Sequence, residues 1–386
     1  MEKVLIIIPY YFPGYRSGGP QQTIRNVVET YGRDVDIYIY TQNHDLGVSN
    51  SYDDIQENIW EKRYGANIMY VSDAEYVKFK NIKNLYYKFD KIYACGLFEL
   101  VTIQLLLVHR IINKLNKYIY IAPMGVFSDG AIRSKFLKKK LFLVLFNNLG
   151  IFKNINWSLT SELEREDIYK HIKKKYLSKY VIAEDLPRKI DFEKMISKLK
   201  NYQKDEKSLH IIFLSRICDK KNLEYCLDIL KDIKDLQIIF DIYGTIEDDR
   251  YWQLCKRKID LLPHSIKTSY KGEVKPEYIE DVFSKYDVFL FPTKGENYGH
   301  VIYESLASGC IPVISDTTPW KNLDDNQCGN VIKLNRIDLF QKKLITYINM
   351  RNNEIKVYKE NAINYARNKY IESITDSGYK KILEVK

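Results

Sequence analysis

VFLFPTKGENYGHVIYESLASGCIPVISDTTPW, residues 288–320, contains the clearest fold signal in this chain. The apolar run Val288–Phe291 is typical of a buried strand, and residues 292–298 contain the proline, glycine and polar residues of a loop. Apolar residues at helical spacing between 299 and 309 predict a short helix, and 311–314 predict a second strand. A strand, a helix and a second strand in this order form the repeating unit of a parallel α/β sheet.

The start of this helix is a predicted binding site for a phosphate group. The backbone N–H groups of Gly299, His300 and Val301 belong to the first helical turn, which has no acceptors of its own, and the helix dipole adds positive potential there. Glu296 lies just before the helix, and Glu304 lies about one and a half turns into it. A phosphate group bound at the helix start would therefore lie between two carboxylates.

The spacing of the two glutamates carries a family resemblance. Seven residues separate Glu296 from Glu304, and SLASGCIPV follows directly. This pattern resembles the E-x7-E signature of the retaining GT-B glycosyltransferases of family 4, also called group 1. The longer string GENYGH…DTTPW is similar to that of a bacterial subgroup implicated in surface polysaccharides. Because helices often contain two glutamates at this spacing, the resemblance rests equally on Gly299, Gly309 and Pro312.

The resemblance implies a fold and a set of donor contacts. The fold is α/β and GT-B, with two doubly wound, Rossmann-like domains facing across a cleft. Glu296 is the implied catalytic residue, which holds hydroxyls of the donor sugar and stabilises positive charge at the anomeric carbon, and Glu304 binds the ribose. The other implied donor contacts are Asn297, Tyr298, Gly299, His300 and Val301. We expect His300 to bind phosphate through its backbone rather than to act as a base.

Two basic residues follow the predicted strand 209–215. Arg216 and Lys221 match, residue by residue, the Arg and Lys with which the resembled family holds the donor diphosphate. A planar guanidinium and a mobile ammonium at the end of a parallel strand suit a charged leaving group, whereas the alternative interpretation is a solvated basic loop. From the resemblance alone, backbone groups near Gly244 and Val274 line the nucleobase.

The chain begins with another strand, loop and helix. Val4–Ile8 is a continuous apolar run, and Pro20 begins a helix that Gly32 ends. Gly18 and Gly19 directly precede this helix, where they let the backbone approach a phosphate closely. A plain turn explains the pair equally well, but the resembled family has its glycine-rich loop at this place. Both glycines are therefore candidates for donor binding.

Length and the alternation of strands and helices predict two domains. A chain of 386 residues exceeds the usual size of one hydrophobic core. We expect an acceptor-side domain at 1–185, a linker at 186–207, a nucleotide-sugar-binding domain at 208–366, and a C-terminal helix at 367–386 that crosses back to the first domain. Ligands of doubly wound sheets bind at the carboxyl ends of the strands, where the donor-site candidates fall. The site is therefore predicted in the cleft between the domains.

Composition argues against several classes of protein. The first apolar run contains five residues before Pro9, too few for a signal-peptide core, and polar and charged residues interrupt the apolar segment 97–112. We therefore expect a cytoplasmic protein without a membrane span. The six cysteines form no Cys-x-x-Cys pair, which favours buried thiols over a zinc site or disulfides.

Most of the net positive charge lies in one segment. Residues 131–200 contain 17 Lys and Arg against 8 Asp and Glu, an excess of 9 in a chain of net charge +10. Basic residues there precede the apolar run 141–146, which predicts an interfacial helix on an anionic membrane surface. A core helix with a solvated basic edge is the alternative, and the segment contains no recognised motif for reading nucleic acid. The basic candidates are Lys135, Lys138, Lys139 and Lys140.

The family resemblance implies a retaining, hexosyltransferase-type glycosyltransferase. It would transfer a sugar from a UDP- or GDP-linked donor to a glycan, lipid-linked acceptor in cell-surface polysaccharide biosynthesis, at the inner face of the plasma membrane. No metal or other cofactor is expected, because Arg216, Lys221 and the helix start can stabilise the diphosphate. The loop 122–131 resembles an acceptor-side loop of the subgroup, but Met124 and Val126 replace its charged pair.

Three alternatives remain open at this point. Asp34 and Asp36 form the Asp-x-Asp of a metal-dependent GT-A transferase, although they precede their strand rather than follow it. A sugar-nucleotide epimerase or hydrolase of GT-B fold would release nucleotide without an acceptor. A non-catalytic GT-B partner subunit should lack Glu296, Arg216 or Lys221, and this chain contains all three.

Overall fold

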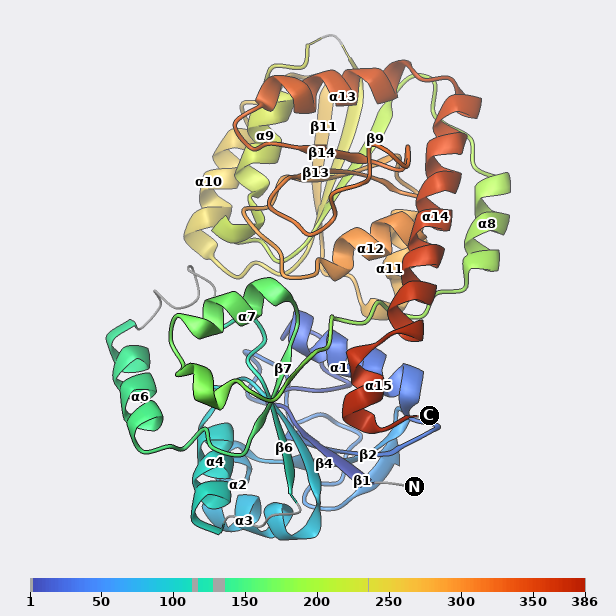
Figure 1. Ribbon diagram of the computed structural model, residues 1–386. Helices are drawn as coiled ribbons and strands as arrows, with labels where there is room; N and C mark the ends of the chain where they lie inside the picture. The colour runs from blue at the N-terminus through green and yellow to red at the C-terminus, as the bar shows by residue number, and fades with distance from the viewer. Residues whose placement is uncertain (1–2, 113–116, 128–135, 235, 386) are drawn as a thin grey trace. The chain divides into compact units, whose positions relative to one another are not determined.

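The computed structural model describes the chain except for residues 1–2, 113–116, 128–135, 235 and 386. The chain divides into two compact units (Figure 1). Unit 1 contains Met1–Pro187 and Ser373–Lys386, and unit 2 contains Arg188–Glu372. Within the described ranges, no helix is both long and apolar enough to cross a bilayer.

Unit 1 contains a mostly parallel sheet. Among its described residues, eight strands lie in the order β3-β4-β2-β1-β5-β6-β7-β8, and only β3 is antiparallel to its neighbour. The strands are β1 Lys3–Ile7, β2 Asp36–Gln42, β3 Glu61–Arg63, β4 Ala66–Val71, β5 Lys91–Cys95, β6 Tyr118–Ala122, β7 Asn156–Leu159 and β8 Tyr180–Ile182. The helices are α1 Gly19–Tyr31, α2 Asp73–Tyr76, α3 Phe79–Lys88, α4 Leu100–Ile112, α6 Phe136–Asn148, α7 Glu162–Tyr169 and α15 Gly378–Leu383, with the 3₁₀ turn η1 at Lys174–Tyr176.

Both faces of the unit 1 sheet are buried. Leu5 and Ile7 of β1 belong to a core shared with α3, α4, α6 and α7, whereas Val4 and Ile6 belong to a second core shared with α1 and α15. Successive strand residues point to opposite faces, so a strand covered on both sides must be apolar throughout. This requirement explains why a continuous apolar run predicted β1.

Unit 2 contains a parallel sheet. Its described strands lie in the order β11-β10-β9-β12-β13-β14 and form a single core with the helices. The strands are β9 Leu209–Leu214, β10 Ile238–Tyr243, β11 Ile266–Gly272, β12 Val288–Phe291, β13 Ile311–Ser315 and β14 Asn330–Ile332. The helices are α8 Phe192–Lys200, α9 Leu223–Lys231, α10 Asp249–Ile259, α11 Ile279–Phe283, α12 His300–Ala307, α13 Ile337–Asn349 and α14 Asn352–Thr375, with 3₁₀ turns η2 Asp219–Lys221 and η3 Pro276–Tyr278.

The strand order of unit 2 reverses between β9 and β12. From β9 the chain builds outward through β10 and β11, and it then returns to place β12 on the other side of β9. In an open parallel sheet, the loops that follow two such strands diverge to opposite faces and leave a crevice at their carboxyl ends. Arg216 and Lys221 follow β9, and Glu296 follows β12, so unit 2 places all three at this point.

Two segments differ from the sequence prediction. The predicted linker 186–207 contains α8, whose Phe192 and Met195 are buried in the unit 2 core. The polar outer face of this helix made the segment resemble a linker in composition. Asp191 caps the helix by accepting a hydrogen bond from the Lys194 N–H at 3.0 Å. The predicted boundary at 366/367 falls inside α14, which continues to Thr375. The part of the chain that belongs to unit 1 resumes at Ser373, in the last turn of this helix.

Candidate functional site

The loop between β12 and α12 depends on the conformation of Gly299. This residue precedes the first residue of α12 and has φ 84° and ψ 58°, in the left-handed region. A Cβ there would lie 2.9 Å from Cδ1 of Ile302 and 3.4 Å from Nε1 of Trp320. Glycine therefore allows the chain to turn sharply into the helix. The N–H groups of the first turn then lie at the carboxyl end of β12, where an anion can approach them.

Glu296 and Lys221 form the central ion pair of the site. The Lys221 ammonium donates to Glu296 Oε1 at 2.6 Å, and the two side chains are only 11% and 10% exposed. The Lys221 ammonium also lies 5.6 Å from the ring centroid of Phe291, the last residue of β12. The sequence prediction placed these two residues in one donor site, and the fold brings them into direct contact across the β9–β12 boundary.

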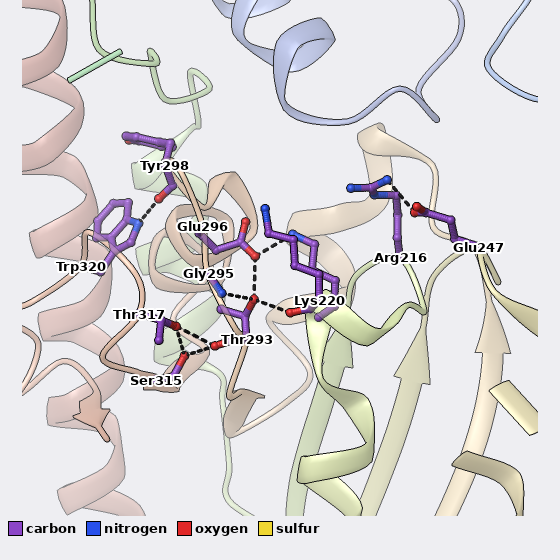
Figure 2. A network of polar contacts seen from close by, with 11 residues as sticks. Arg216, Lys220, Glu247, Thr293, Gly295, Glu296, Tyr298, Ser315, Thr317 and Trp320 are labelled. Carbon is purple, nitrogen blue, oxygen red and sulfur yellow. Dashed lines mark hydrogen bonds and ion pairs between the residues drawn. The ribbon is translucent and has the colours of Figure 1, made fainter. Parts of the chain in front are cut away.

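Thr293 connects the ion pair to the backbone of the neighbouring loop (Figure 2). Its hydroxyl oxygen lies 3.0 Å from Glu296 Oε1 and 3.1 Å from the Lys220 carbonyl oxygen. The Thr293 carbonyl accepts hydrogen bonds from the hydroxyls of Ser315 at 2.6 Å and Thr317 at 2.7 Å. These contacts hold the loop that carries Glu296, and the sequence prediction did not include Thr293, Ser315 or Thr317 among the site residues.

The β9–α9 loop is tied to the same structure. Asn222 has a left-handed φ of 61°, and its side-chain amide donates to the Pro292 carbonyl at 2.8 Å. The Lys294 N–H donates to the Lys220 carbonyl at 2.9 Å, and the Lys294 ammonium lies 2.6 Å from Asp219. The two loops that carry Lys221 and Glu296 are thus held together by backbone contacts as well as by the ion pair.

Arg216 has a different partner in the structure. Its guanidinium donates to Glu247 at 2.6 Å, and Figure 2 shows it turned toward this carboxylate rather than toward Glu296. The Arg216 and Glu247 side chains are 40% and 47% exposed, so the pair is solvated and contributes little to stability. Glu247 was not among the predicted site residues, because it lies 31 residues further along the chain, after β10.

His300 is neutral at physiological pH. Burial lowers the pKa of its imidazole to about 4, and the nearby Lys221 charge acts in the same direction. Its ring lies 4.9 Å, centroid to centroid, from that of Tyr298. A group with this pKa is a weak proton acceptor at pH 7. The environment therefore agrees with a packing role for the ring at the start of α12.

The remaining candidates of this loop have distinct environments. Glu304 is buried inside α12, and Asn297 is exposed. The Tyr298 carbonyl accepts a hydrogen bond from the Trp320 indole N–H at 2.6 Å, and the two rings form an edge contact at 5.5 Å. Trp320 thus fixes the backbone just before Gly299, a contribution that only the tertiary structure reveals.

Gly244 and Val274 lie at the ends of β10 and β11. A Cβ on Gly244 would lie 1.8 Å from the Ser215 carbonyl oxygen, so close backbone packing against the end of β9 requires glycine here. The Gly244 carbonyl accepts a hydrogen bond from the Tyr270 hydroxyl at 2.8 Å. Val274 is half-buried just after β11. Both positions lie at the carboxyl edge of the sheet. The requirement for glycine at position 244 is explained by its packing against the Ser215 backbone.

Gly18 and Gly19 begin α1 in unit 1. Gly18 has φ 81°, which favours glycine. Gly19 has no such backbone requirement, and a Cβ there would contact no described atom within 4 Å. The structure surrounding Gly19 therefore gives no packing reason for glycine.

The basic candidates of the 131–200 segment belong to unit 1. Lys135 lies outside the described residues. Lys138 and Lys140 are exposed on α6, whereas the Lys139 ammonium lies over the Phe98 ring, 5.1 Å from its centroid. In the loop before this helix, Met124 has a left-handed φ of 57°.

Comparison with known proteins identifies the family of the second unit. Residues 195–369 match the family described as "Glycosyl transferases group 1". Unit 2 is a group 1 glycosyltransferase domain. A protein of Klebsiella pneumoniae described as "Uncharacterized 41.2 kDa protein in cps region" is 25% identical over 259 residues, which cover 66% of this chain and 67% of that protein.

Solved structures share the fold of the whole chain. Anabaena Alr3699/HepE in complex with UDP-glucose superimposes with a TM-score of 0.67 at 14% identity, covering 100% of this chain and 99% of the other. WaaG, described as a glycosyltransferase involved in lipopolysaccharide biosynthesis, superimposes with a TM-score of 0.63 at 14% identity, covering 99% of both chains. These similarities confirm the predicted GT-B fold, and the family match over residues 195–369 supports a glycosyltransferase.

Proposed function

We propose that this glycosyltransferase is retaining and metal-independent, and that it transfers a sugar from a nucleotide sugar to a lipid-linked glycan. The observation that carries the proposal is the contact between Lys221 and Glu296 at 2.6 Å, at the strand-order reversal and beside the start of α12. A cation, a carboxylate and a set of helix N–H groups there suit a donor with an anionic diphosphate and a polar sugar.

Cleavage of the anomeric C–O bond determines what each group must do. The diphosphate gains negative charge as it leaves, and the Lys221 ammonium and the N–H groups of Gly299 to Val301 would stabilise it. Arg216 would exchange its solvated partner Glu247 for the diphosphate, at little cost in stability. Glu296 would hold the sugar hydroxyls and stabilise the positive character of the anomeric carbon.

Retention of the anomeric configuration follows in this proposal from the direction of attack. The acceptor hydroxyl attacks from the face that the diphosphate leaves, and the departing phosphate oxygen takes its proton. This route needs no side-chain base. The route agrees with the pKa of about 4 at His300, which makes this imidazole a weak base, and with the ion pair that Glu296 forms with Lys221.

Metal independence is a separate part of the proposal. Lys221 and Arg216 supply positive charge that stabilises the leaving diphosphate, which is the role of a divalent ion in metal-dependent transferases. Transfer should therefore persist in excess EDTA, measured as release of nucleoside diphosphate. Complete loss in EDTA with recovery on adding Mn²⁺ would contradict this part and favour a site at Asp34 and Asp36.

The substrates are proposed from the relatives. The complex of HepE with UDP-glucose favours a UDP-linked donor over a GDP-linked one. The cps-region relative and the lipopolysaccharide enzyme WaaG support an acceptor in cell-surface polysaccharide biosynthesis. A lipid-linked acceptor of this kind would locate the enzyme at the inner face of the plasma membrane.

A two-step assay tests the proposed function. Nucleotide sugars are first screened for thermal stabilisation of the protein, and the best one is then incubated with and without membrane lipid extracts from a polysaccharide-producing bacterium. We expect release of nucleoside diphosphate that depends on the extract. Rapid release without acceptor would instead indicate a hydrolase, and failure of every nucleotide sugar to bind would indicate a non-catalytic subunit.

A further inference from the structure

Helix α6 is apolar on two opposite faces, and the residues of unit 1 that the structure describes cover only one of them. On the inner face, Leu143 is buried in the core, and Phe142 and Phe146 pack against it. The Phe142 ring lies 5.4 Å from that of Phe98. A helix that is apolar all round is normally buried in protein or in lipid. The outer face of α6 therefore needs an explanation beyond the fold of unit 1.

The outer face exposes large aliphatic side chains in a continuous row. Their spacing along the chain is that of one helical face, continued by the residue just after the helix. This α6 stripe consists of Leu137, Leu141, Val144, Leu145 and Leu149, which are 80%, 62%, 48%, 48% and 62% exposed. Figure 1 shows α6 at the outer edge of unit 1. An exposed row of this size marks an interaction surface.

The positive charge near the α6 stripe favours an anionic partner. The sequence from 130 to 161 contains six Lys and Arg and no Asp or Glu. Lys138 and Lys140 lie exposed on α6 itself, within one turn of the first two stripe residues. A second copy of this chain would bring like charges together, whereas a surface of phosphate groups would complement them.

We propose that the α6 stripe inserts into the interfacial region of an anionic phospholipid bilayer, with Lys138 and Lys140 against the phosphate groups. The 13 residues of α6 extend about 20 Å, less than the roughly 30 Å of the hydrocarbon layer, so the helix lies along the surface. Aliphatic side chains enter the acyl boundary while lysines reach the head groups. This docking surface goes beyond the proposed transfer reaction and does not depend on it.

The test is co-sedimentation of the full chain with vesicles of phosphatidylcholine, with or without one third phosphatidylglycerol. The stripe variant Leu137→Gln, Leu141→Gln, Leu145→Gln keeps helix propensity and changes only exposed side chains. We expect it to bind anionic vesicles about 100-fold more weakly than the wild type, because three of the five aliphatic side chains of the stripe then no longer contribute apolar burial. Circular dichroism checks that the fold is retained.

A second variant tests the charges independently. Lys138→Gln with Lys140→Gln should bind about 30-fold more weakly at low salt, since each lysine near an anionic surface contributes about a factor of five. The difference from wild type should shrink at high salt.

Matched controls come from exposed residues elsewhere in the same unit. Leu163→Gln on α7 and the pair Lys80→Gln, Lys83→Gln on α3 should bind as the wild type does, because they lie outside the α6 stripe. Three results would each overturn the proposal: no binding of the wild type to anionic vesicles, equal binding of the stripe variant, or equal binding to neutral vesicles. Concentration-dependent dimerisation that the stripe variant abolishes, without vesicle binding, would assign the stripe to a second copy and equally refute it.

Discussion

Removing the Lys221 ammonium should destabilise unit 2, and the loss should depend on the charge of Glu296. At 2.6 Å and an effective dielectric constant of about 20, the gross Coulomb attraction of the pair is about 6 kcal/mol. Desolvation of two side chains that are each about nine-tenths covered offsets most of this attraction. A net coupling of about 1.5–3 kcal/mol remains, the range for hydrogen bonds between charged groups.

A double-mutant cycle in urea measures this coupling. The free energy of unfolding is compared for the wild type, Lys221→Met, Glu296→Gln and the double variant, with intrinsic fluorescence as the signal. The Arg216 and Glu247 pair provides a matched control, because it has the same 2.6 Å separation but is 40% and 47% exposed. Its coupling should not exceed about 1 kcal/mol.

The comparison of the two cycles can refute the reasoning. Equal coupling in both pairs would show that burial does not strengthen the Lys221 and Glu296 contact. A coupling below about 0.5 kcal/mol at Lys221 and Glu296 would show that the pair does not hold the two loops together.

Arg216→Ala and Lys221→Ala should each weaken UDP binding by about 1.5–3 kcal/mol, and calorimetry showing unchanged affinity in both would place the diphosphate elsewhere. Gly19→Ala should leave the free energy of unfolding unchanged yet lower UDP affinity, whereas Gly18→Ala should cost about 1–2 kcal/mol of stability because of its φ of 81°. UDP affinity unaffected in Gly19→Ala would remove that glycine from the donor site. The lowered pKa of His300 means that the unfolded chain binds a proton between pH 6.5 and about 4 that the folded chain does not bind. The free energy of unfolding should therefore decrease as the pH is lowered from 6.5 to about 4, and it should decrease less in His300→Gln.

The sequence predicted best those elements whose burial is uniform. Strand β12 begins and ends at the predicted residues, Val288 and Phe291, because a parallel strand covered on both faces must be apolar along its length. The position of Gly299 at the start of α12 was equally readable, since a left-handed turn before a helix favours glycine. Neither inference needs any contact that is distant in the sequence.

The contacts within the candidate site could not be predicted, because they join loops that lie far apart in the sequence. The sequence placed Lys221 and Glu296 in one site, but their direct contact joins residues 75 positions apart. Glu247 as the partner of Arg216, and Ser315 and Thr317 as supports of the Thr293 carbonyl, arise from how the β9, β10 and β13 loops meet. Helix α8 was missed because its outer face is polar, so composition indicated a linker.

The most direct test of the account is the turnover of the Glu296→Gln protein. Glutamine keeps the shape of the side chain and can still accept a hydrogen bond from Lys221, but it removes the negative charge that would stabilise the anomeric carbon. We predict that kcat for sugar transfer falls at least about 100-fold, roughly 2.7 kcal/mol in the transition state, while UDP affinity changes by less than about threefold. A variant with normal UDP affinity and wild-type kcat would contradict the role assigned to Glu296.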